Sequence, residues 1–210
     1  MLIDFNYIKD KYNLDITGIV HVGAHYGEEI PSYLERGIKK IVCFEPLIEN
    51  LEVLIQYRSD IVKVFPYALG ETEDTVTMYR SSNNLESSSV LKPKMHLELY
   101  QGIKFNSTSE VKMKKLSSFK KSIVGCNFLN MDVQGYEFQV LLGAEDSIRQ
   151  FDYIYAEVNR DETYENNVLV DKIDEYLELN GLVRVETNWA GVIWGDAFYI
   201  RKELLNDNIL

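Results

Sequence analysis

One short stretch near the beginning of the chain limits the possible folds more than any other. Residues 18–30 form an apolar run that breaks at Gly23 and Gly27 and then continues in a helix-like pattern. Glycines in a strand-to-helix turn leave the backbone free of side chains, so that a ligand can approach the main chain and the first N–H groups of the helix. The stretch therefore predicts a strand, a tight turn with a binding site, and a helix.

A second apolar run, residues 40–46, contains Glu45 near its end. In a doubly wound sheet, a carboxylate at the tip of the second strand accepts the ribose hydroxyls of a nucleotide-type ligand that approaches the glycine turn. The spacing of Gly23 and Gly27 differs from that of dinucleotide folds and of phosphate loops, which counts against NAD, FAD, ATP and a Rossmann oxidoreductase. An ordinary turn beside a solvated glutamate is the alternative that these local features leave open.

Composition predicts one domain over residues 1–210. The chain is 46% hydrophobic and 26% charged, and none of its apolar runs approaches the ~20 residues that span a bilayer. Its first residues lack a signal-peptide pattern, and Cys43 and Cys126 lie in apolar runs, so we expect buried free thiols and a cytoplasmic location. The net charge of −11 argues against nucleic acid as a partner, because phosphate binding depends on clustered Lys and Arg. The sequence gives no basis for an oligomeric state.

Strand and helix patterns alternate along the chain, which predicts an α/β fold with a mostly parallel sheet, helices on both faces and ligands beyond the carboxyl ends of the strands. The expected elements are an N-terminal helix within 1–16, strands at 17–22, 40–45, 61–65, 126–132 and 153–159, helices at 28–36, 46–55, 136–149 and 168–179, and a final hairpin of strands at 182–186 and 192–200. Residues 80–110 are rich in Ser and Asn and are expected to form a loop or lid insertion, in which His96 and Tyr100 are candidates for contacting a substrate.

Two strands in the second half of the chain end in carboxylates. Asp132 follows one apolar run, and Glu157 and Asn159 lie at the far end of the next. Carboxylates in apolar strands are costly unless they are paired, hydrogen-bonded or used, so we expect a polar floor beside the ligand. Trp189 and Asp196 in the final hairpin suit a sugar-like substrate and equally suit strand packing.

Six short segments occur in an informative order over roughly residues 17–200. They are HVGAHYG at 21–27, CFEP at 43–46, ALG at 68–70, SSS at 87–89, LNMDVQGYE at 129–137 and YAEVN at 155–159. Together they resemble the FkbM family of S-adenosylmethionine-dependent methyltransferases. The resemblance implies a Rossmann-like class I methyltransferase fold, with a seven-stranded sheet whose last strand is antiparallel, and methyl transfer, most often to a hydroxyl of a sugar or polyketide.

The resemblance also implies which residues hold the cofactor. His21, Gly23, Ala24, His25 and Gly27 are expected near the methionyl end of S-adenosylmethionine, Glu45 on the ribose, and Ala68 and Leu69 near the adenine. The chain departs from the common family pattern at three positions: His21 replaces a frequent Asp, His25 a frequent Asn, and Asn130 a commoner Lys. The departure at 21 leaves open which group holds the amino group of the methionine moiety.

We expect Asp132 to accept the proton of the acceptor hydroxyl, because its strand tip should face the methyl group while Glu45 is committed to the ribose. Glu157 is the second candidate for this role and His96 the third. The candidates for substrate contact are Ser88, Ser89, Asn159, Trp189 and Asp196. In an alternative mechanism, Asp132, Glu157 and Asn159 hold a Mg²⁺ ion that lowers the pKa of the substrate oxygen.

The sequence thus predicts an O-methyltransferase that acts on a hydroxyl of a sugar or glycan. Two alternatives are an O-methyltransferase for a non-sugar small molecule and a catalytically inactive nucleoside-binding module of the same fold. The departures at His21 and Asn130 favour the inactive module mildly. Asp132 and Glu157 count against it, because a binding module needs the Glu45 side of the site but no polar floor at the transfer position.

Overall fold

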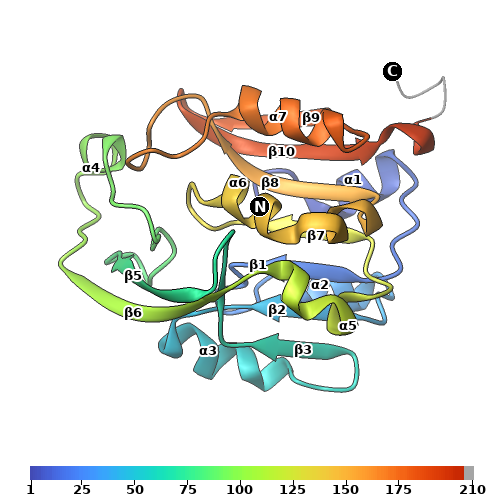
Figure 1. Ribbon diagram of the computed structural model, residues 1–210, viewed down its shortest axis with the longest axis horizontal. Coiled ribbons are helices and arrows are strands. Elements are labelled where there is room, and N and C mark those ends of the chain that lie inside the picture. The colour runs from blue at the N-terminus through green and yellow to red at the C-terminus, as the bar shows by residue number, and fades with distance from the viewer. Residues whose placement is uncertain (206–210) are drawn as a thin grey trace.

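The computed structural model describes residues 1–205 and has a seven-stranded sheet at its centre (Figure 1). Its strand order is β3-β2-β1-β7-β8-β10-β9, and β10 runs antiparallel to both of its neighbours. The strands are β1 (Ile19–Val22), β2 (Ile41–Phe44), β3 (Val62–Phe65), β7 (Phe128–Met131), β8 (Tyr153–Asn159), β9 (Leu182–Ala190) and β10 (Trp194–Arg201). The predicted mostly parallel sheet with an antiparallel last strand is confirmed.

Helices cover both faces of this sheet, as predicted. Alternate strand residues point to opposite faces, so Ile19 and Ile41 belong to one core cluster while Val20 and Val42 belong to another. The first cluster includes residues of α1 (Phe5–Lys11), α2 (Ile30–Glu35) and α3 (Ile48–Leu54), and the second includes residues of α5 (Lys120–Ile123), α6 (Glu137–Ala144) and α7 (Val170–Leu179). Strands covered on both faces read as continuous apolar runs, which is why these strands could be recognised in the sequence.

One predicted helix is shorter than expected. The pattern over residues 136–149 predicts a single helix, but α6 ends at Ala144 and the chain continues as the 3-10 helix Glu145–Gln150. Glu145 has a left-handed backbone with a φ of 48°, which an α-helix cannot contain. The apolar spacing continues through this break, so the sequence pattern alone could not locate it.

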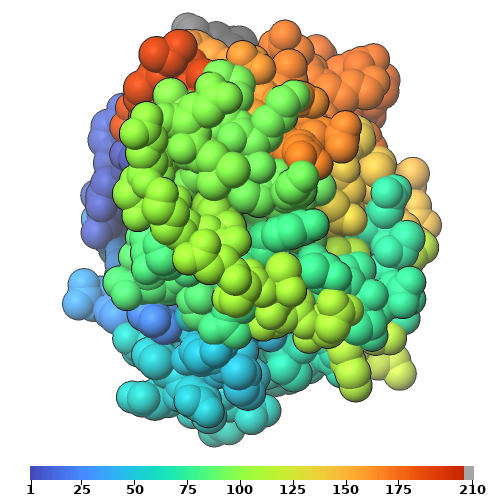
Figure 2. Space-filling model, turned by 90° about the vertical axis from the view of Figure 1, so that its left-hand side faces the viewer, coloured from blue at the N-terminus to red at the C-terminus, as the bar shows by residue number. Residues whose placement is uncertain are grey.

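A second sheet of three strands lies beside the carboxyl ends of the parallel strands, at the left of Figure 1. It consists of β4 (Ala68–Leu69), β5 (Asp74–Arg80) and the central strand β6 (Ser107–Lys114). The predicted insertion at 80–110 therefore contains the start of β6, and it also contains the helix α4 (Met95–Leu99). Figure 2 looks onto this edge of the molecule and shows the green residues of the insertion lying across it.

Both cysteines are buried free thiols, as predicted. Cys43 lies in β2, and Cys126 precedes β7 by two residues. Within residues 1–205, no helix combines the length and the apolar composition that a membrane crossing needs.

Candidate active site

Two adjoining cavities open at the carboxyl ends of the parallel strands. The large cavity, of about 460 Å³, is lined by residues of β1, β8 and β10, and the small cavity, of about 50 Å³, by residues that follow β2 and by the small sheet. Gly23, His25 and Asp132 line both, so the two cavities meet beyond the tips of β1 and β7. Doubly wound sheets bind their ligands at this position.

The glycine turn after β1 depends on close backbone packing. Gly23 has a φ of 77°, and a Cβ atom there would lie 1.9 Å from the carbonyl oxygen of Asp132. Gly27 has a φ of 84°, and a Cβ atom there would lie 2.8 Å from the side chains of Ile30 and Leu54. Gly23 therefore lets the tips of β1 and β7 approach each other, whereas Gly27 lets the turn pack on the core.

Glu45 follows β2, and its buried carboxylate lines the small cavity. One oxygen accepts a hydrogen bond from the backbone N–H of His25 at 3.0 Å, and the other accepts from the N–H of Leu47 at 2.9 Å and from Nδ2 of Asn50 at 3.3 Å. Burial outweighs these hydrogen bonds and raises the pKa of Glu45 to about 7. Glu45 thus joins the glycine turn to the start of α3, and it titrates near neutral pH.

Most of the remaining wall of the small cavity is apolar. Ala68 and Leu69, which are expected near the adenine, lie on this wall, and so do Leu85 and Ser88 of the insertion. The other apolar wall residues are Val22, Pro46, Leu47, Met78, Val90 and Val133. A carboxylate beside an apolar slot is the residue set that the ribose and the base of a nucleoside need.

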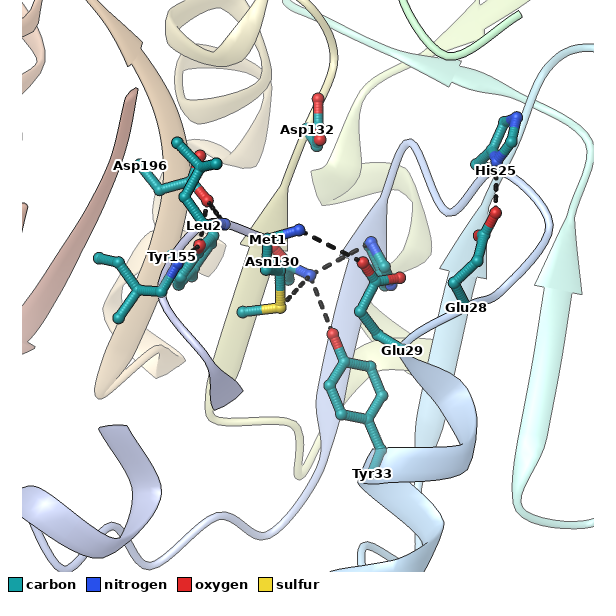
Figure 3. A network of polar contacts seen from close by, with 12 residues as sticks. Met1, Leu2, His25, Glu28, Glu29, Tyr33, Asn130, Asp132, Tyr155 and Asp196 are labelled. Atoms are coloured by element: carbon teal, nitrogen blue, oxygen red, sulfur yellow. Dashed lines mark hydrogen bonds and ion pairs between the residues drawn. The ribbon is translucent and has the colours of Figure 1, made fainter. Parts of the chain in front are cut away.

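His25 connects the glycine turn to the insertion. Its Nδ1 lies 2.7 Å from Oε1 of Glu28, a contact shown in Figure 3, and its Nε2 lies 2.8 Å from the carbonyl oxygen of Asn84. Burial lowers the pKa of His25, but the hydrogen bonds to Glu28 and Asn84 outweigh it and raise this pKa to about 9. Because both partners are acceptors, the ring is an imidazolium that donates from both nitrogens.

His21 and Asn130 are neighbours in the register of β1 and β7, and both line the large cavity. Nδ2 of Asn130 lies 3.2 Å from Nε2 of His21 and 2.9 Å from the hydroxyl of Tyr33. Burial lowers the pKa of His21, so its ring is neutral. Nδ1 of His21 and Oδ1 of Asn130 are buried, and among the described residues neither has a hydrogen-bond partner. A buried polar atom without a partner needs an explanation, and a polar ligand in the adjoining cavity would supply one.

The amide of Gln134 bridges the two strand-tip carboxylates. Its Nε2 donates to Oδ1 of Asp132 and to Oε2 of Glu157, each at 2.7 Å. The backbone of Gln134 is left-handed, with a φ of 56°, and its Oε1 lies 2.9 Å from the hydroxyl of Tyr164. This bridge holds the carboxylates side by side at the ends of β7 and β8.

The two bridged carboxyl groups differ in exposure. Asp132 is exposed to the cavity, whereas Glu157 has only 4% of its surface exposed. Burial, followed by the negative charges of Asp132 and Glu137, raises the pKa of Glu157 well above its usual value. Removal from bulk water also raises the pKa of Asp132, although the hydrogen bond from Gln134 opposes this rise. A raised pKa makes Asp132 a stronger base than a free aspartate.

Residues from the two ends of the sequence form another wall of the large cavity (Figure 3). Asp196 on β10 accepts hydrogen bonds from the hydroxyl of Tyr155 and from the backbone N–H of Leu2. The amino nitrogen of Met1 lies 3.7 Å from Oε1 of Glu29. Asp196 was predicted as a substrate contact, but the part played by Met1 and Leu2 was not.

The outer wall of the large cavity is aromatic. Nε1 of Trp194 donates to the hydroxyl of Tyr100 at 2.6 Å, and the rings of Tyr100 and His96 lie 5.0 Å apart. His96 is buried, its pKa is lowered by that burial, and its Nδ1 has no partner among the described residues. The insertion therefore brings His96 and Tyr100, the two candidates for substrate contact, to the large cavity.

Five predicted site residues line neither cavity: Ala24, Gly27, Ser89, Asn159 and Trp189. Oδ1 of Asn159 accepts from the hydroxyl of Thr163 at 2.6 Å, and Oγ of Ser89 donates to the carbonyl of Gln134 at 2.7 Å. The ring of Trp189 stacks on the guanidinium of Arg160, whose Cζ lies 3.6 Å from the ring centroid. Asn159 and Ser89 therefore contact residues that line the cavities, Thr163 and Gln134, without lining a cavity themselves.

The residues do not support the predicted magnesium alternative. Within residues 1–205, no three His, Cys, Asp or Glu side chains come together as metal ligands would. Asn159, the proposed third ligand, directs its oxygen to Thr163, and the amide of Gln134 donates to both Asp132 and Glu157.

Gln134, Tyr155 and Glu86 line the large cavity but were not predicted as site residues. A polar residue followed by Gly135, directly after a strand that ends in Asp132, is a signal for a left-handed turn that could have identified Gln134. Tyr155 and Glu86 carry no comparable signal, because their role depends on strand register and on the path of the insertion.

The fold and the site define a class I methyltransferase, and comparisons with known proteins agree. The family model described as the methyltransferase FkbM domain matches residues 21–183, so the chain belongs to this family. A similar curated protein is the 2-O-methyltransferase NoeI of Sinorhizobium fredii (strain NBRC 101917 / NGR234), which is 25% identical over 166 residues. The match spans 71% of this chain and 66% of that protein, which is less than two thirds of its length.

Solved structures share the fold at low sequence identity. Magnesium protoporphyrin IX methyltransferase from Synechocystis PCC 6803 matches with a TM-score of 0.51 and 9% identity, over 92% of this chain and 74% of that one. The methyltransferase domain of bacterial CtHen1 matches with a TM-score of 0.52 and 7% identity, over 93% and 95% of the two chains. At this identity the likeness concerns the fold alone.

Proposed function

We propose that the protein transfers a methyl group from S-adenosylmethionine to a hydroxyl of a sugar or glycan. The observation that carries this proposal is the pair of bridged carboxyl groups, Asp132 and Glu157, beside a large cavity that meets the cofactor side at Gly23. The similarity to a 2-O-methyltransferase supports transfer to oxygen. A cytoplasmic location stays a prediction.

The residues of the small cavity fit the nucleoside part of the cofactor. Glu45 would accept the ribose hydroxyls, and Ala68 and Leu69 would contact the adenine. Gly23 would let the methionyl part pass close to the backbone toward the large cavity, where His21 and Asn130 hold unpaired polar atoms. When bound, S-adenosylmethionine supplies a methyl group that its sulfonium already activates.

The residues of the large cavity then have two tasks, which are to align the acceptor hydroxyl and to remove its proton. Alignment of reacting groups supplies roughly 7–11 kcal/mol in favourable intramolecular models. Asp132 is the proton acceptor, because its carboxylate faces the cavity and its pKa is raised. Gln134 is a positioning residue that holds this carboxylate in place, and buried Glu157 acts through the same bridge.

The outer wall favours a saccharide among possible acceptors. Tyr100 and Trp194 offer aromatic surface, on which the C–H face of a sugar ring can pack, next to hydroxyl and imidazole groups that can bind its hydroxyls. A non-sugar small molecule with a hydroxyl is the second candidate acceptor, since the same surface would bind an aromatic ring.

The test is to incubate the protein with ¹³C-methyl-labelled S-adenosylmethionine and a mixed library of sugars and hydroxylated aromatic compounds. Mass spectrometry would find the labelled product, and NMR would locate the methyl group. We expect an O-methyl sugar with the native protein, and its formation at least about a hundredfold more slowly with Asp132→Asn. Binding of S-adenosylhomocysteine without methylation of any compound would favour the inactive nucleoside-binding module, and a labelled aromatic compound would favour the second acceptor class.

A further inference from the structure

We infer that the acceptor sugar carries a free, positively charged amine. This inference rests on the proposed function and narrows its substrate class. It is drawn from the charges around the large cavity, from the hydrogen bonds of its floor and from its aromatic wall.

The described lining of the large cavity is strongly unbalanced in charge. It contains six carboxylate residues, Glu28, Glu29, Glu86, Asp132, Glu157 and Asp196, and among those described it contains no Lys or Arg. The positively charged groups at the lining are His25, which pairs with Glu28, and the amino group of Met1, which lies near Glu29. Glu86, Asp132, Glu157 and Asp196 have no ion pair with either cation, although the positive charge of the Met1 amino group acts on Asp132 and Asp196 from a distance.

Three of these four carboxyl groups lie together on the floor of the cavity. Asp196 on β10 lies opposite Glu157 on β8. Asp132 directly follows Met131 of β7, and Met131 pairs with Ala156, the residue before Glu157. The donors that reach these groups are neutral: the amide of Gln134, the hydroxyl of Tyr155 and a backbone N–H. Carboxyl groups this close repel one another when ionised, which contributes to the raised pKa of Glu157. A cation on the acceptor would relieve the repulsion that the positive charge of the cofactor leaves in place.

The remaining wall of the cavity suits an ammonium group as well. His96 is buried with an unpaired Nδ1, and beside it Tyr100 and Trp194 offer aromatic faces that attract cations. A phosphate or a carboxylate on the acceptor would face the six acidic residues with no Lys or Arg to neutralise it. The cavity is therefore built to admit an amino sugar and to reject an acidic sugar.

The experiment compares matched sugars that differ at one substituent. Gluco-, galacto- and mannopyranosides are each assayed as the 6-amino-6-deoxy sugar, its N-acetylated form and the uronic acid, so that the three differ only at C6, with tritiated S-adenosylmethionine as methyl donor. We expect a kcat/KM about tenfold higher for a free amine than for its N-acetylated partner, and the lowest value for the uronic acid. Calorimetric titration with S-adenosylhomocysteine accompanies each assay.

A pair of charge-reversal variants tests the cause of the preference. Glu86 is exposed and lines both cavities, so Glu86→Lys should reduce the ratio of kcat/KM between amine and N-acetylated forms. Both forms are assayed with the same cofactor, so an effect of the variant on cofactor binding cancels in this ratio. Glu52 is exposed on α3 and lines neither cavity, so Glu52→Lys makes the same charge change and should leave the ratio as it is.

A kcat/KM for the N-acetylated or acidic sugars that equals or exceeds that for the free amines would overturn the inference. The proposal that the protein methylates sugars would then still hold. Binding of S-adenosylhomocysteine with no sugar methylated in any form would instead refute the proposed acceptor class, and the inference with it.

Discussion

We predict that the protein binds its cofactor more tightly as the pH rises through neutrality, because the Glu45 carboxyl group ionises in this range. Burial raises the pKa of Glu45 to about 7 in the free protein, so the carboxylate gains charge between pH 6 and pH 8. A group with a pKa of 7 is about one-eleventh ionised at pH 6 and about ten-elevenths ionised at pH 8. If only the ionised form accepts the ribose hydroxyls, the Kd should fall about tenfold over this range, or about 1.4 kcal/mol.

The assay is calorimetric titration with S-adenosylhomocysteine at pH 6, 7 and 8, on the native protein and on Glu45→Gln. Glutamine cannot ionise, so the variant should bind weakly and lose the pH dependence that Glu45 causes. The imidazolium of His25 should contribute little to the pH dependence of Kd, because its pKa is raised to about 9 and it stays charged between pH 6 and pH 8. An equal pH dependence in the variant and the native protein would refute the assignment of Glu45, as would a native Kd that does not change with pH.

Three further predictions concern the turn, the bridge and the metal. Gly23→Ala should lower the melting temperature much more than Gly37→Ala. Both glycines have a positive φ, but only a Cβ atom at Gly23 would clash with the carbonyl of Asp132. Similar melting temperatures for the two variants would refute the packing argument. Gln134→Ala should lower kcat by the equivalent of about 1–3 kcal/mol. It should also move the kcat–pH profile to higher pH, because Asp132 loses a hydrogen-bond donor that lowers its pKa. An unchanged profile would show that the hydrogen bond from Gln134 does not act on Asp132. The rate of methyl transfer should be the same with and without EDTA. A rate that falls with EDTA and recovers when Mg²⁺ is added would contradict a metal-free mechanism.

Much of the fold and part of the site could be predicted because burial leaves a clear pattern in the sequence. The short parallel strands are covered on both faces, so they read as apolar runs, and Glu45 and Asp132 were noticeable as carboxylates at the ends of such runs. β6 could not be found in this way, because most of its residues outside Val111 and Met113 are polar and at least partly exposed.

Other features of the site depend on contacts that no local pattern records. The hydrogen bond between Leu2 and Asp196 joins residues 194 positions apart. Trp189 was predicted as a substrate contact, but strand register brings Trp194, and not Trp189, to the large cavity. Side-chain packing between distant segments decides such placements.

In the proposed mechanism Asp132 removes the acceptor proton, and single-turnover methyl transfer by Asp132→Asn measures this step. General base catalysis contributes about 10²–10⁴-fold, so the variant should transfer the methyl group at least about a hundredfold more slowly than the native protein. Its affinity for S-adenosylhomocysteine should stay similar, which separates loss of chemistry from loss of binding. A transfer rate within a few-fold of the native rate would contradict the account and move the role of base to another residue.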